Sequence, residues 1–174
     1  MDEYSTYSGG SASEQSGKGI QMSATGLDVF DTTIQKTNTW LKELMQIGDW
    51  ESRNTAYRAL RATLHALRDR LTVDETAQLS AQLPMLVRGL YFEGWDPRIR
   101  TLKERHLEQF LERIEQELRG DEQLDPIEVA RAVFMVMQQR VTEGEIEDVR
   151  HMLPSKIREL WPVPEQAHSA RGRQ

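Results

Sequence analysis

The chain has 174 residues, of which 38% are hydrophobic and 29% are charged, and it contains no cysteine. This length suits one ordinary globular domain or two small ones, and the lack of cysteine excludes a disulfide scaffold. The first residues are acidic and no apolar run approaches twenty residues, so we expect a cytoplasmic protein without membrane insertion. A net charge of −6 argues mildly against binding along a nucleic-acid backbone.

The two ends of the chain differ in composition from its middle. Residues 1–27 are rich in Ser and Gly and have no apolar residues at helical or strand spacing. Such a segment buries too little surface to offset the entropy of ordering, which predicts a disordered arm. Residues 163–174 follow Pro162, are polar, and are predicted to form a flexible tail. The folded body is therefore expected over residues 28–162.

Helical periodicity in the first half of the body predicts four helices. Apolar residues recur every three or four positions over residues 28–46 and again over 56–71. Thr72–Glu75 has the spacing of a capping box, which places the start of a third, short helix there. The Leu83–Pro84 step ends that helix, because proline disfavours helical geometry at the residue before it, and Pro84 suits the start of a fourth helix.

The second half of the body repeats these signals and brings the expected total to about eight helices. Thr101–Glu104 is a capping box before another apolar stripe, and Gly120 is a natural stop for that helix. Asp125–Pro126 combines a helix cap with a proline at the first helical position. Thr142–Glu145 then opens a short helix, and Leu153–Pro154 leads into the last one. The predicted fold class is all-α.

An internal repeat relates the two halves. A shift of 70 residues aligns residues 57–91 with 127–161 without a gap, and nine of the 35 pairs are identical. The identities lie mainly at caps and helix breaks, which favours a tandem duplication with units 28–96 and 101–162. Units of this size cannot bury their apolar faces alone, so we expect them to share one core as a pseudo-twofold pair.

Three segments carry a resemblance to a known family: Phe30–Leu44 (FDTTIQKTNTWLKEL), Tyr57–Leu71 (YRALRATLHALRDRL) and Gln82–Trp95 (QLPMLVRGLYFEGW). They closely resemble the prokaryotic domain of unknown function 2267 family, and the resemblance extends over about residues 28–162. It implies a bacterial, all-helical, duplicated protein. The family carries no established activity that the resemblance could transfer to any residue of this chain.

Sequence motifs for catalysis, metal binding or cofactor binding are weak or absent. The pair Asp148 and His151 has metal-ligand spacing, but the equivalent positions in the first unit, Gln78 and Ala81, do not repeat it. The glutamates between residues 104 and 115 follow one another on the face opposite an apolar stripe, which is typical of a solvated helix. No Gly-x-Ser-x-Gly elbow or phosphate-binding loop is present. We therefore expect no enzyme, no metal site and no cofactor.

A basic stripe on the second predicted helix is the one feature that suggests nucleic-acid binding. Arg58, Arg61, His65 and Arg68 fall on one side of that helix, away from its apolar stripe. Such a row of cations could contact phosphates or an acidic protein partner. The second unit does not repeat it, so a twofold basic surface is not expected.

Four tryptophans, at positions 40, 50, 95 and 161, offer large rings for a core edge or for a partner. Trp50 and Trp95 are the candidate partner contacts, because both lie at predicted helix ends. The sequence thus predicts a non-enzymatic protein-interaction or self-associating module, whose N-terminal arm orders on a partner. Two alternatives stay open: an accessory protein that binds nucleic acid through Arg58, Arg61 and Arg68, and a carrier of a small ligand or cofactor in the helical core.

Overall fold

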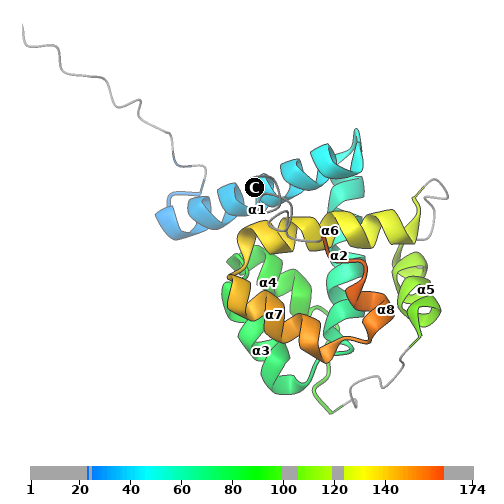
Figure 1. Ribbon diagram of the computed structural model, residues 1–174. Coiled ribbons are helices and arrows are strands. Elements are labelled where there is room, and N and C mark those ends of the chain that lie inside the picture. The colour runs from blue at the N-terminus through cyan, green and yellow to red at the C-terminus, as the bar shows by residue number, and fades with distance from the viewer. Residues whose placement is uncertain (1–22, 24, 99–105, 119–123, 163–174) are drawn as a thin grey trace, which may run out of the picture.

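The computed structural model describes residues 23, 25–98, 106–118 and 124–162. These residues form eight α-helices and no strand, which confirms the all-α prediction (Figure 1). The predicted arm up to residue 22, the tail 163–174, the capping box Thr101–Glu104 and Gly120 lie outside the described residues.

The helix bounds agree closely with the helix starts and breaks predicted from the sequence. The first four helices are α1 (Asp28–Gly48), α2 (Arg53–Arg68), α3 (Val73–Gln82) and α4 (Met85–Phe92). The other four are α5 (Leu107–Glu117), α6 (Pro126–Arg140), α7 (Glu143–Met152) and α8 (Ser155–Arg158). The shortest of them, α8, spans a single helical turn of four residues.

Both of the helix caps predicted on described residues form. The Thr72 hydroxyl accepts from the backbone N–H of Glu75 at 3.2 Å, and the Asp125 carboxylate accepts from the N–H of Ile127 at 2.9 Å. Thr142 precedes α7 as predicted, but its side chain makes no cap hydrogen bond. The backbone carbonyl of Thr142 still accepts from the N–H of Ile146 at 3.1 Å, as in an ordinary first helical turn.

Both Leu-Pro steps break the chain in the same way. Leu83 and Leu153 are extended, with φ −85° for each and ψ of 145° and 144°. This is the backbone region that a following proline imposes. Arg88 and Arg158, four residues after each proline, donate to the carbonyl oxygens of Leu83 and Leu153 at 3.4 and 3.2 Å. The breaks are therefore braced by equivalent arginines.

The two long helices α2 and α6 pack against each other and form the centre of the molecule. Helix α1 packs on both of them and runs across the top of Figure 1, and α5, at the right, also packs on both. Helix α3 packs on α7. The core between these helices includes the fully buried Leu64 of α2 and Phe134 of α6. Trp161 packs against this core, with the centroid of its ring stacked 4.2 Å from that of Phe134.

No helix in the described part of the chain is both long and apolar enough to cross a membrane.

Candidate interaction surface

The basic stripe of α2 is largely covered by the rest of the fold: Arg58 and Arg61 keep intermediate exposure, and the other two residues are buried. His65 and Arg68 are only 3% and 4% exposed, so the expectation of a row of cations directed away from the core is wrong for these two residues. The physical reason is packing between elements far apart in sequence: α5, from the second half of the chain, packs along α2, and the end of α4 contacts Arg68. Apolar periodicity within α2 could not show that its polar side would also be covered.

His65 joins three helices through its two ring nitrogens. Nε2 lies 2.8 Å from the carbonyl oxygen of Leu90 in α4, and Nδ1 lies 3.0 Å from Oε1 of Glu117 in α5. A carbonyl oxygen can only accept, so Nε2 carries a proton and donates it. Burial raises the pKa of Glu117, but its hydrogen bond to His65 and the charges of His65 and Arg61 outweigh this, and the pKa is lowered overall.

The arginines of the stripe are matched by acceptors from the neighbouring elements. Arg61 donates through Nη1 to Glu117 and through Nε to Glu93, both at 2.7 Å. The bond to Glu93 raises the pKa of Arg61 and lowers that of Glu93. Arg68 donates to the carbonyl oxygens of Tyr91 at 2.7 Å and Glu93 at 3.0 Å. Arg58 donates to the carbonyl oxygen of Leu118.

This arrangement, which we call the α2 polar network, consists of Arg58, Arg61, His65, Arg68, Glu93 and Glu117. Its cations are bonded to carbonyl oxygens and carboxylates of the same chain. The predicted nucleic-acid contacts thus lie close together, but their hydrogen bonds connect α2 to the end of α4 and to α5. A phosphate would have to displace these acceptors to bind here.

The described residues contain no group of three or more His, Asp or Glu side chains placed to hold a metal ion. Asp148 and His151 are exposed on α7. Glu108, Glu112 and Glu115 are exposed on α5, which confirms the predicted solvated face for these three.

The two candidate tryptophan contacts are half-buried and pack within the chain. The ring of Trp50 lies directly on Gly48, so close that a Cβ atom at Gly48 would be 2.3 Å from it. The ring of Trp95 lies 5.1 Å from that of Phe92. Trp40 and Trp161 are buried at 4% and 3% exposure. The tryptophans are therefore chiefly contacts within the fold, and their use by a partner stays a prediction.

An apolar groove between α1, α2 and α4 is the feature that the sequence reasoning missed. It has a volume of about 480 Å³ and is lined by Leu41 of α1, by Tyr57 of α2, and by Met85 and Leu86 of α4, among other residues. Tyr57 is 41% exposed and Met85 and Leu86 are each 49% exposed. The signal was present in the sequence: Met85 and Leu86 follow Pro84 side by side, and a short helix cannot bury both of them together with Val87 and Leu90.

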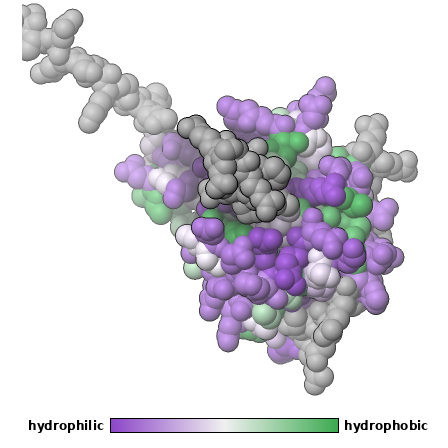
Figure 2. Space-filling view, viewed as in Figure 1, coloured by the Kyte–Doolittle hydropathy of each residue, from purple (hydrophilic) through white to green (hydrophobic). Residues whose placement is uncertain are grey.

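A large apolar side chain also projects from the same face of α1. Phe30 is 44% exposed and precedes Thr37, which lines the groove, by seven residues, or about two helical turns. In the view of Figure 2 the surface is mostly hydrophilic, with small separate apolar patches, one of which lies over the first turns of α1. We call Phe30, Tyr57, Met85 and Leu86 together the α1–α4 apolar face.

The eight helices and the contacts between them define an all-α domain. Within that class, the chain belongs to the family described as an uncharacterized conserved protein, DUF2267, whose model matches residues 37–160. The match begins inside α1 and ends just after α8. No curated protein matches the chain.

Proposed function

We propose that this protein is a non-enzymatic protein-contact module of the bacterial cytoplasm and that it acts through the α1–α4 apolar face. The observation that carries this proposal is the exposure of three large apolar side chains around one groove, at 41–49% each, with Phe30, 44% exposed, about two turns away along α1. Large apolar side chains left exposed around a groove cost solubility, and they commonly mark a site where another protein binds. The arginines of α2 that suggested nucleic-acid binding are, in contrast, bonded to acceptors within the fold.

A second copy of the chain is the partner that we propose for this face. The face combines a projecting side chain, Phe30, with a hollow beside Tyr57 and Leu86, and both lie along one side of α1. A twofold pairing brings the same patch of both copies together, so each copy can place its projection against the hollow of the other. This arrangement would bury the exposed apolar side chains of both copies at once.

Measurement of the solution mass, by light scattering during gel filtration over a range of concentrations, tests the proposal. Leu86→Glu places a charge on the face and is expected to shift the protein from dimer to monomer. Met152→Glu is the matched control, because Met152 of α7 is similarly exposed, at 42%, and does not line the groove. A wild-type monomer at all concentrations, or a dimer that survives Leu86→Glu, would overturn self-association through this face.

The two alternatives gain no specific support from the structure. Binding of nucleic acid through Arg58, Arg61 and Arg68 would require the α2 polar network to exchange its internal acceptors for phosphates. A ligand carrier would need a cavity inside the helical core, and the two hollows described for this chain open at the surface beside α1. We retain the protein-contact function for these reasons.

We further infer that the fold arose by tandem duplication, with the first helix of each unit packing on both units. Helix α1 packs on α6 of the other unit and α5 packs on α2, while α2 with α6 and α3 with α7 form self-related pairs. Arg140 pairs with Glu43 of α1, and its repeat counterpart Arg70 lies over the ring of Phe110 in α5, 5.1 Å from its centroid. Both arginines thus reach the first helix of the opposite unit, as a pseudo-twofold axis requires.

A further inference from the structure

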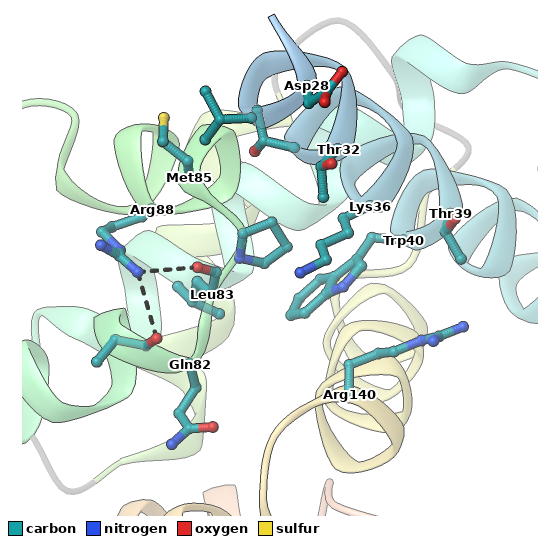
Figure 3. A pocket seen from close by; sticks show the side chains of 14 residues that line it. Asp28, Thr32, Lys36, Thr39, Trp40, Gln82, Leu83, Met85, Arg88 and Arg140 are labelled. Carbon is teal, nitrogen blue, oxygen red and sulfur yellow. Dashed lines mark hydrogen bonds between the residues drawn. The ribbon is translucent and has the colours of Figure 1, made fainter. Parts of the chain in front are cut away.

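A second hollow lies on the other side of α1 and differs from the apolar groove in its charge. It has a volume of about 690 Å³ and lies between the first half of α1, the α3–α4 break and the end of α6. Figure 3 shows Lys36 and Trp40 of α1 reaching toward Leu83, with Arg88 of α4 and Arg140 of α6 on opposite sides. We call it the basic pocket.

The basic pocket carries positive charge that the fold only partly neutralises. Arg140 is paired with Glu43. Arg88 donates to the carbonyl oxygens of Ser80, Ala81 and Leu83, which are neutral groups. In the part of the chain that the structure describes, neither Arg88 nor the exposed Lys36 has a carboxylate partner. Asp28 is the acidic residue that lines the pocket.

The cations are spread around the pocket and do not converge on one point. Lys36 lies beside the indole of Trp40, and Arg140 lies beyond it (Figure 3). This spacing suits an extended chain with several carboxylates better than one small anion. The wall between the cations is apolar, since Pro84, Met85 and Trp40 all line it. A matching peptide would therefore combine acidic residues with aromatic or aliphatic ones.

One segment of this chain has that composition and is attached at the edge of the pocket. Residues 1–22 contain three acidic residues, Asp2, Glu3 and Glu14, against the single basic residue Lys18, a net charge of −2, together with Tyr4, Tyr7 and Ile20. Residues 163–174 carry Glu165 against Arg171 and Arg173, a net charge of +1, so the other end of the chain does not match.

The attachment point favours binding within the same molecule. Asp31, in the first turn of α1, accepts hydrogen bonds from the hydroxyl of Ser23 and from the backbone N–H of Thr25, which fixes the chain where residue 22 begins. Asp28 and Val29, in the same turn, line the pocket. A tether of this kind gives an effective concentration of about 1 mM, so even weak complementarity suffices for substantial occupancy.

We propose that residues 1–22 bind in the basic pocket of their own chain, with their carboxylates near Lys36 and Arg88 and their apolar side chains against Trp40 and Pro84. Figure 3 shows the surfaces that such a segment would meet. This proposal does not depend on the function of the α1–α4 apolar face, because Lys36 and Trp40 do not line that groove.

A spin label on the segment tests the proposal, and the absence of cysteine makes the labelling unique. In the full-length chain carrying Ser5→Cys with a nitroxide, the NMR signals of the Trp40 indole N–H and the Lys36 amide are expected to lose at least half of their intensity. The amide of Met152, on α7, is expected to keep its intensity and serves as the internal reference. Asp2→Asn combined with Glu3→Gln should restore most of the lost intensity.

A matched pair of lysine substitutions supplies the control. Lys36→Glu reverses the charge in the pocket and should restore the Trp40 signal, whereas Lys42→Glu should not, because Lys42 is exposed on the same helix and does not line the pocket. A Trp40 signal no weaker than that of Met152, or one that Lys36→Glu leaves weakened, would overturn the proposal. The proposal is also overturned if a spin-labelled chain weakens the Trp40 signal of a separate, isotope-labelled chain, because the segment then binds another copy.

Discussion

The polar side chains of α2 show what directional bonds add to an apolar core. Packing of α5 against α2 buries apolar surface, but an apolar contact alone tolerates sliding of one helix along the other. His65 and Arg61 hold Glu117 at 3.0 and 2.7 Å, which fixes one position of α5 relative to α2. At the residue scale, the α2 polar network therefore sets the register of a helix pair.

Loss of the carboxylate at position 117 should be costly. Glu117→Gln leaves the nearly buried His65 and the half-buried Arg61 without their charged acceptor, and we expect it to lower the free energy of unfolding by about 1.5–3 kcal/mol. Urea denaturation at pH 7 measures this change. Glu115→Gln, on the exposed side of the same helix, is the control and should change stability by no more than about 0.5 kcal/mol. Equal effects of the two substitutions would contradict the role of the network.

The same carboxylate gives stability a defined dependence on pH. The pKa of Glu117 is lower in the folded chain than in the unfolded chain, so its contribution is complete above the unfolded value of about 4.3 and declines as the pH falls through the folded value. The difference in stability between wild type and Glu117→Gln should accordingly shrink on acidification.

At the scale of elements, the end of α1 is an unusually tight turn. Asp49 adopts the left-handed conformation, with φ of 53°, and the N–H of Trp50 donates to the carbonyl of Met45 at 2.9 Å. The chain therefore folds back and places the indole on Gly48, where a side chain would not fit. Glycine is needed at this position for close approach and not for its backbone angles.

Two glycine-to-alanine substitutions are expected to change stability in opposite directions, one in this turn and one in α7. Gly48→Ala should displace the Trp50 ring and lower the free energy of unfolding by about 1–3 kcal/mol, the cost of overpacking. Gly144→Ala, within α7 and with open space around it, should raise stability by about 0.5–1 kcal/mol through helix propensity. Thermal unfolding followed by circular dichroism measures both changes, and a neutral Gly48→Ala would show that the ring moves aside freely.

These elements show which features of the fold could be predicted from the sequence and which could not. The caps at Thr72 and Asp125 and the breaks at Leu83 and Leu153 depend on neighbouring residues, and they were predicted. The burial of His65 and Arg68 depends on α5, some fifty residues later, and on the end of α4, and a one-helix pattern gives no information about either. The apolar groove likewise forms only where α1, α2 and α4 meet, although the adjacent Met85 and Leu86 indicated that α4 would leave apolar side chains exposed.

At the scale of the whole molecule, the crossed packing should make the two halves inseparable in unfolding. Because α1 packs on α6 and α5 packs on α2, neither half keeps its core when the other unfolds. We expect a single cooperative transition in urea, with tryptophan fluorescence and circular dichroism giving the same midpoint. Two separated transitions would show instead that each half is stable alone.

The same crossed arrangement has a consequence for biosynthesis. A ribosome releases the chain from its N-terminus, and α1 emerges long before residues 126–140, on which part of its surface packs. Until then the apolar sides of α1 and α2, including Leu44 and Leu64, lack part of their cover. The nascent first half is thus expected to complete its fold only near the end of translation, and the interval before α6 emerges is when this chain would depend most on a chaperone.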